Sequence, residues 1–115
     1  MSNQSLNITV ESMARVELIT VSGRVDSNSA GELEKAVNDI IARHEYNIVL
    51  ELSGVDYMSS AGLRVLISAL RTCKSKRGNV CLVAVNARVD EVLELAGIKP
   101  MFDIYENTTA AVGSF

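Results

Sequence analysis

The chain has 115 residues, which is the size of one domain, and 11 Lys and Arg against 14 Asp and Glu give a formal net charge of −3. Hydrophobic residues make up 48%, enough to bury a core and to exclude a disordered chain. A histidine-rich metal site is excluded because there is one His, and a disulfide scaffold because there are two Cys. A nucleic-acid module is disfavoured because the only aromatic residues are two Phe and three Tyr, with no Trp. We expect a single domain over residues 1–115, with its core at about 6–112, in a reducing compartment.

The N-terminal part of the chain predicts a pair of strands. Leu6, Ile8 and Val10 alternate with polar residues, which is the pattern of a half-buried strand. The segment 16–21 predicts a second strand, close enough to the first to form a hairpin, and Ser22-Gly23 ends it.

A helix is predicted next. Ser29 and Glu32 have the spacing of a capping box, in which the two side chains satisfy free backbone N–H groups of the first turn. An apolar stripe at helical spacing follows and contains Leu33, Ala36, Val37, Ile40 and Ile41. We interpret His44, at the end of the stripe, as a helix-terminal cation or a packing residue.

The rest of the chain alternates between apolar strands and helices. In chain order the expected elements are a central strand at 48–52, a loop through Ser53-Gly54, a helix from Ser59-Ser60 to Gly78, a strand at 80–85, a helix between Asn86 and Gly97, a strand at 101–105 and a short helix from Thr108. The predicted order is ββαβαβα. This order indicates an α/β fold with a mostly parallel mixed sheet, an N-terminal hairpin and helices packed on the sheet.

The most informative segment is 56–63, which reads Asp-Tyr-Met-Ser-Ser-Ala-Gly-Leu. Ser59 and Ser60 stand where a helix follows a buried strand, and the free N–H groups of a first helical turn favour an anion. Gly62 keeps the backbone bare, so that a bulky group can approach. In the purely structural interpretation, one of the two serines caps the helix.

Charge is distributed unevenly along the chain. Residues 57–89 contain no acidic residue but six basic ones, namely Arg64, Arg71, Lys74, Lys76, Arg77 and Arg88. Residues 1–56 carry a balance of −5 and residues 57–115 a balance of +2. This pattern is typical either of two different faces presented to one partner or of solvated helix faces.

A catalytic role has little support in the sequence. A nucleophilic serine needs a general base, and His44 is the only histidine. Neither a phosphate-binding loop nor a dinucleotide-binding glycine motif is present. Cys73 and Cys81 fall on apolar patterns and are interpreted as core residues. We therefore predict no enzymatic activity, no metal and no cofactor. Asp26 and Asp56 could form a pair of carboxylates, but the sequence does not specify the distance between them.

Three segments resemble the STAS-domain anti-sigma factor antagonists of bacteria. The segment 56–63 is similar to the phosphorylation motif of that family. Gly23-Arg24-Val25-Asp26, followed by Ser29-Ala30, resembles its element between the second strand and the first helix, and 47–52 resembles the strand that leads into the phosphorylation loop. The resemblance covers about Leu6 to Val112.

The resemblance implies a partner switch. In this family the unphosphorylated antagonist binds an anti-sigma factor that is itself a serine kinase, and this frees a sigma factor. Phosphorylation of one serine with Mg-ATP breaks the complex, and a PP2C-type serine phosphatase restores binding. The antagonist is then the substrate and the ligand. We also expect a cytoplasmic protein with no direct contact to nucleic acid or membrane, and a monomer, because the sequence shows no exposed apolar stripe beyond the core faces.

Matching Gly62-Leu63 to the Gly-Leu of the family motif puts Ser60 at the phosphorylated serine, with Ser59 as second choice. Ser59 stands where many members have Asp, and Ala61 replaces a second serine. The implied partner-binding residues are Asp26, Asp56, Met58, Ser59, Gly62, Leu63 and Arg64. Two alternatives remain: a non-switching STAS scaffold or transporter-complex subunit, and a small hydrolase or transferase that uses Ser60.

Overall fold

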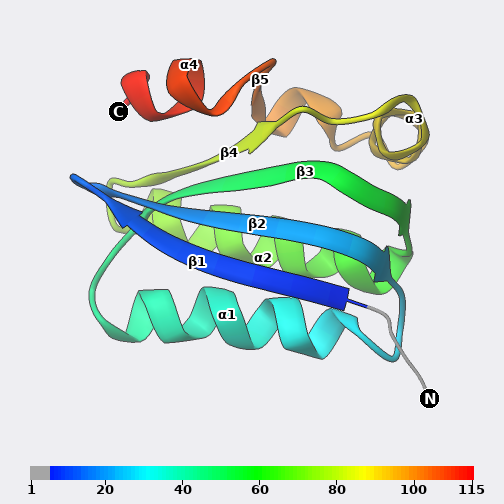
Figure 1. Cartoon of the computed structure of the whole chain (residues 1–115), viewed down its shortest axis with the longest axis horizontal. Coiled ribbons are helices and arrows are strands. Elements are labelled where there is room, and N and C mark those ends of the chain that lie inside the picture. Colours follow the sequence, from blue (N-terminus) through cyan, green and yellow to red (C-terminus); the bar gives the residue numbers. More distant parts are fainter. Residues whose placement is uncertain (1–5) are drawn as a thin grey trace.

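A computed structural model describes residues 6–115, and one five-stranded sheet in the order β1-β2-β3-β4-β5 organises them (Figure 1). The strands are β1 (Leu6–Met13), β2 (Val16–Val25), β3 (Asn47–Met58), β4 (Asn79–Val83) and β5 (Asp103–Tyr105). β1 is antiparallel to β2, and all other pairs are parallel. The predicted mixed sheet with an N-terminal hairpin is confirmed. Residues 1–5 of the predicted domain lie outside the described residues.

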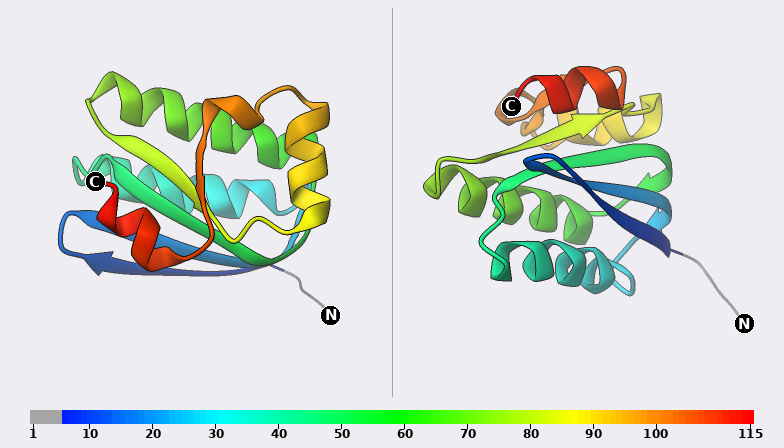
Figure 2. Two further views of the ribbon diagram at one scale, coloured as in Figure 1. Left: turned by 90° about the horizontal axis from the view of Figure 1, so that it is seen from above. Right: turned by 60° about the vertical axis from the view of Figure 1, so that its left-hand side comes forward.

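The helices form a layer on each side of the sheet (Figures 1 and 2). The layer below the sheet in Figure 1 holds α1 (Ala30–Ala42) and α2 (Ser60–Ser75). On the other side lie α3 (Ala87–Leu95), the 3-10 turn η1 (Lys99–Met101) and α4 (Thr108–Gly113). Among residues 6–115, no helix has the length and apolar character needed to cross a membrane.

The core lies on both faces of the central strand. Ile48, Val49 and Leu50 of β3 are fully buried, as the apolar run of this strand predicts. Ile48 and Leu50 belong to the larger cluster, which includes the inward faces of α1 and α2. Val49 belongs to a smaller cluster beside Ala111 of α4. The α/β class is therefore confirmed. The strand expected at 101–105 and the helix expected from Thr108 are present as β5 and α4, and only the 3-10 turn η1 was not predicted.

Two strands are longer than predicted. β2 continues through Ser22-Gly23 to Val25, and β3 continues through the predicted loop at Ser53-Gly54 to Met58. The extensions pair with each other, with two register shifts. A Cβ on Gly54 would lie 2.6 Å from the Cβ of Ser22, so glycine here allows two strands to approach closely and does not mark a turn.

The start of α1 is not the predicted capping box. Ser29 occupies the N-cap position, but its hydroxyl makes no capping bond and instead donates to the carbonyl oxygen of Arg24 at 2.6 Å. The carboxylate of Asp26 accepts the backbone N–H of Ser29 at 3.1 Å in place of a capping box with Glu32.

Other boundaries also differ from the predictions. The left-handed residue after α2 is Arg77, with φ 66°, and Gly78 is needed because a Cβ there would collide with the carbonyl oxygen of Tyr46. His44 lies beyond α1, exposed and at φ 62°, and its Nδ1 is 3.2 Å from the hydroxyl of Tyr46. At the other end of the fold, Asn86 caps α3 and Gly97 follows it at φ 74°, as predicted.

The last two strands are shorter than predicted. β4 ends at Val83, and the next residue, Ala84, has a left-handed backbone with φ 56°. β5 begins at Asp103 because Pro100 and Met101 form the 3-10 turn η1, where Pro has no N–H to give to a sheet. Both ends fall where the backbone conformation interrupts an otherwise apolar run.

A buried carboxylate ties the hairpin to α1. Glu17 on β2 is only 5% exposed, and its Oε1 accepts the hydroxyl of Ser12 at 2.9 Å and the Nη2 of Arg43 at 3.1 Å. Arg43 directly follows the last residue of α1. The ion pair therefore fixes the end of α1 on the edge of the sheet.

Candidate functional site

The two adjacent serines at the start of α2 have different environments. Ser59 is the N-cap, and its hydroxyl oxygen accepts the backbone N–H of Gly62 at 3.4 Å. Ser60 is the first helical residue, and it is exposed. One serine is therefore used for capping, while the other presents its hydroxyl to solvent beside the N–H groups of the first helical turn.

The start of α2 is held against the ends of β2 and β3. Met58 pairs with Val25, and the backbone N–H of Ser59 donates to the carbonyl oxygen of Val25 at 2.8 Å. A Cβ on Gly62 would lie 2.7 Å from Cγ1 of Val25 and would also overlap the sulfur of Met58. Val25 and Met58 thus occupy the space beside the Cα of Gly62, so this position is not open to an external group.

Asp26 orders the turn between β2 and α1. Its Oδ1 accepts the backbone N–H groups of Asn28 at 2.9 Å and of Ser29 at 3.1 Å. These hydrogen bonds, that of Asn28 first, hold the pKa of the Asp26 carboxyl below its ordinary value of 3.8. Asp26 is half-buried, so its carboxylate orders this turn and is also partly accessible to solvent.

Sequence reasoning did not identify the pair formed by Arg24 and Tyr57. The two residues are opposite each other in the β2–β3 register, and the guanidinium carbon of Arg24 lies 4.2 Å from the centre of the Tyr57 ring. Arg24 also lies 3.4 Å from Oδ2 of Asp26. Arg24 and Tyr57 belong to two segments that resemble the family motifs, 23–26 and 56–63. They form a pair only because β2 and β3 extend past their predicted ends.

The structure separates Asp56 from this cluster. Asp56 is exposed and lines a groove of about 350 Å³ that also includes Asn86 and Arg88, at the start of α3. The side chain of Asn86 connects the two elements, because its amide donates to the carbonyl oxygen of Val55 and its oxygen caps α3. Asp56 therefore borders the opposite helical layer from α1 and α2.

A shallow groove of about 320 Å³ lies between α1 and α2 next to Ser60. Its lining consists of Ala30, Gly31, Glu34, Ala61, Arg64, Val65 and Ser68. Arg64 is exposed and stands one turn after Ser60, and the first turn of α2 contains no acidic residue. Of the predicted partner-binding residues, Met58, Gly62 and Leu63 are buried, so they support this surface from below.

The surroundings of Ser60 offer little for serine catalysis. His44 follows the end of α1 near the start of β3, whereas Ser60 follows the end of that twelve-residue strand. Burial raises the pKa of the Cys73 thiol to about 11 and also raises that of Cys81, and both are buried as predicted. Within residues 6–115, no group of three His, Cys, Asp or Glu side chains is arranged to hold a metal ion.

The whole fold matches a known family. The STAS domain model matches residues 7–111, so the chain belongs to the STAS-domain family. BtrV of Bordetella bronchiseptica, provisionally named an anti-sigma factor antagonist, is 28% identical over 96% of this chain and 95% of its own. The anti-sigma F factor antagonist of Paenibacillus polymyxa is 27% identical over 94% of this chain and 93% of its own.

Solved structures agree with this assignment. An anti-sigma factor antagonist from Mycobacterium paratuberculosis has a TM-score of 0.86 and 26% identity, over 96% of this chain and 93% of its own. The Bacillus protein SpoIIAA has the same fold. Its unphosphorylated form matches with a TM-score of 0.81 and 17% identity. Its phosphorylated form matches with a TM-score of 0.76 and 15% identity. The proteins from Bordetella bronchiseptica, Paenibacillus polymyxa and Mycobacterium paratuberculosis thus share the name anti-sigma factor antagonist.

Proposed function

We propose that this protein is an anti-sigma factor antagonist controlled by phosphorylation of Ser60. The unphosphorylated protein binds an anti-sigma factor that is also a serine kinase, and a sigma factor is released. The kinase phosphorylates Ser60, which breaks the complex, and a PP2C-type phosphatase restores the binding form. The observation that carries this proposal is the exposed hydroxyl of Ser60 at the start of α2.

The environments of the two serines favour Ser60 as the acceptor. The hydroxyl of Ser59 accepts the N–H of Gly62, and Ser59 is half-buried. A kinase would have to displace this cap before it could reach the Ser59 oxygen. Ser60 requires no such rearrangement, so it remains the first choice and Ser59 the second.

A phosphate on Ser60 has a simple physical effect on binding. It adds a charge of roughly −1.5 to −2 and three acceptor oxygens. The helix N-terminus tolerates this charge within the domain, so the fold survives. A partner surface that buries the neutral hydroxyl would have to desolvate the new charge. Complete switching needs roughly 5 kcal/mol of differential affinity, which is reasonable for a buried dianion.

The proposed docking surface surrounds Ser60. It includes the groove between α1 and α2 with Arg64, and the turn with Asp26 and its neighbours Arg24 and Tyr57. Met58, Gly62 and Leu63 are buried and act by holding α2 in place. In this cycle the protein is a substrate and a ligand, and its partners carry the catalytic groups. We expect the exchange to occur in the cytoplasm, where transcription takes place.

Phosphate mapping tests the proposal. The protein is incubated with its cognate anti-sigma kinase and Mg-ATP, and phosphorylated peptides are located by mass spectrometry. We expect one phosphate on Ser60, retained in Ser59→Ala and lost in Ser60→Ala. Phosphate only on Ser59 would contradict the assignment of the acceptor. No phosphate on either serine would instead support the non-switching scaffold or transporter-complex subunit.

A further inference from the structure

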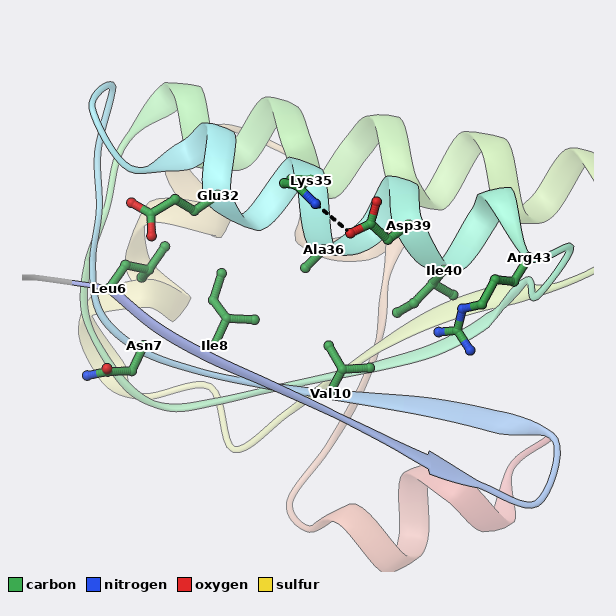
Figure 3. A pocket seen from close by; sticks show the side chains of 10 residues that line it. All are labelled: Leu6, Asn7, Ile8, Val10, Glu32, Lys35, Ala36, Asp39, Ile40 and Arg43. Atoms are coloured by element: carbon green, nitrogen blue, oxygen red, sulfur yellow. Dashed lines mark hydrogen bonds and ion pairs between the residues drawn. The ribbon is translucent and has the colours of Figure 1, made fainter.

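A groove of about 640 Å³ runs between β1 and α1 (Figure 3), and Ser60 is not among the residues that line it. The apolar side chains of Leu6, Ile8 and Val10 line it from the strand. The charged side chains that line it all come from the helix and the residue after it, and are Glu32, Lys35, Asp39 and Arg43. The strand also contributes Asn7, and the helix also contributes the apolar Ala36 and Ile40. The groove therefore combines a mainly apolar strand lining with a helix lining that carries all the charges, and neither is used by the proposed phosphorylation switch.

β1 is an edge strand that can accept another strand. It pairs with β2 on one side, and no strand within residues 6–115 pairs with its other edge. Its eight residues include no Pro and no Lys, and Glu11 is the only charged residue among them. Val10 is 45% exposed and points into the groove. These features are typical of an edge that gains a strand from a partner.

The charges on α1 show which partner fits. Along the helix they run acid, base, acid, base, from Glu32 through Lys35 and Asp39 to Arg43, over roughly 16 Å. A second copy of α1 lying antiparallel presents the reverse order. Glu32 then faces Arg43 of the second copy, and Lys35 faces Asp39, so the charge pattern is complementary to itself. This is the property of a two-fold interface.

We propose that β1 and α1 form the interface of a homodimer. β1 pairs with β1 of a second copy in antiparallel orientation, and the two α1 helices lie side by side. The two-fold axis passes near Thr9, which lies midway between the groove-lining residues Ile8 and Val10. Ile8 then lies opposite Val10 of the second copy, and the two five-stranded sheets become continuous. The sequence predicted a monomer because it shows no exposed apolar stripe beyond the core faces, whereas the fold places the exposed Val10 on an edge strand.

The existing ion pairs are compatible with the dimer. Lys35 already contacts Asp39 at 2.9 Å, but both side chains are mostly exposed, so the pairs of two copies can join into one network. Arg43 uses Nη2 to bind Glu17, and its guanidinium group has further N–H donors. Ser60 does not line the groove, so dimerisation leaves it accessible.

The oligomeric state of the full chain tests this proposal. Sedimentation velocity from micromolar to millimolar concentration should give twice the 12.4 kDa chain mass at the upper end. Val10→Lys should remain monomeric, whereas the control Leu95→Lys, at an 83% exposed position on α3, should dimerise like the wild type. A wild type that stays monomeric, or a Val10→Lys variant that dimerises normally, would overturn the proposal. Circular dichroism establishes that each variant is folded.

A charge exchange tests the orientation of the two helices. Lys35→Asp places a second carboxylate opposite Asp39 of the other copy and should raise the dissociation constant of the dimer about tenfold. The double variant Lys35→Asp with Asp39→Lys restores opposite charges and should restore wild-type association. Failure of the double variant to recover association would refute the antiparallel arrangement of α1.

Discussion

The backbone N–H of Ser59 donates a hydrogen bond to the carbonyl oxygen of Val25 at 2.8 Å, which joins the cap of α2 to the last residue of β2. Because Asp26 directly follows Val25, this hydrogen bond joins the turn before α1 to the start of α2. The exposed Ser60 is the next residue after this hydrogen bond. Ser60 and the turn that contains Asp26 therefore lie at the same end of β2 and β3.

Replacing the two serines should separate their structural roles. Ser59→Ala removes the hydroxyl that accepts the N–H of Gly62 and should lower the free energy of unfolding by about 1 kcal/mol. Ser60→Ala removes an exposed hydroxyl and should change this free energy by less than about 0.5 kcal/mol. Urea unfolding of both variants measures the difference. An equal loss in the two would show that Ser59 is not the cap.

Gly62 should tolerate no side chain. Gly62→Ala forces a Cβ against Val25 and Met58 and should cost about 1–3 kcal/mol. Gly31→Ala is the matched control, because among the described residues nothing lies within 4 Å of the added Cβ, and it should stabilise α1 by roughly 0.5–1 kcal/mol. Chemical denaturation should therefore show a lower free energy of unfolding for Gly62→Ala and a higher one for Gly31→Ala than for the wild type. A neutral Gly62→Ala variant would mean that α2 does not contact the strands this closely.

The Asp26 turn should make stability depend on pH in acid. The folded-state pKa of Asp26 is lower than its ordinary 3.8, so the unfolded chain binds more protons there. Its contribution is complete above this value and is lost as the pH falls through the lowered pKa. Asp26→Asn should therefore be less stable than the wild type at pH 7, with a smaller difference at about pH 3. Urea midpoints at both pH values check this. A difference independent of pH would contradict it.

The ion pair of Arg43 with the buried Glu17 should contribute measurably to stability. Arg43→Ala leaves the Glu17 carboxylate with only the hydroxyl of Ser12 among its bonds to side chains of the described residues, and should cost about 1–2 kcal/mol. Lys35→Ala removes an exposed pair with Asp39 and should cost about 0.3–0.5 kcal/mol. Thermal and urea unfolding at low protein concentration compare the two. Similar losses would show that burial of Glu17 adds nothing to its pair.

Apolar periodicity predicted most elements, but glycines misled the placement of their ends. Ser53-Gly54 has the composition of a loop, yet it continues β3 because Gly54 lies against Ser22 on a neighbouring strand. Gly78 has the position of a left-handed helix stop, but Arg77 adopts that conformation. In both cases a contact with a residue distant in sequence decides the role of the glycine, and local patterns carry no information on such contacts.

The candidate site could be predicted only in part, because some of its features are local and others depend on contacts between distant residues. The double serine at a strand-to-helix junction identified the start of α2, because capping and helix geometry are local properties. Which serine caps the helix follows only from the hydrogen bond that the backbone N–H of Gly62 donates to the hydroxyl oxygen of Ser59. The Arg24–Tyr57 pair and the separation of Asp56 from Asp26 depend on the register of β2 and β3, which no local pattern specifies.

The affinity of the two forms for the anti-sigma factor tests the proposed switch most directly. Protein carrying phosphoserine at position 60 and unmodified protein are titrated separately into the purified anti-sigma factor, and dissociation constants are measured by calorimetry. We expect the phosphorylated form to bind several thousandfold more weakly, which corresponds to the roughly 5 kcal/mol that complete switching needs. Equal affinity of the two forms, with both correctly folded, would contradict phosphorylation of Ser60 as the switch.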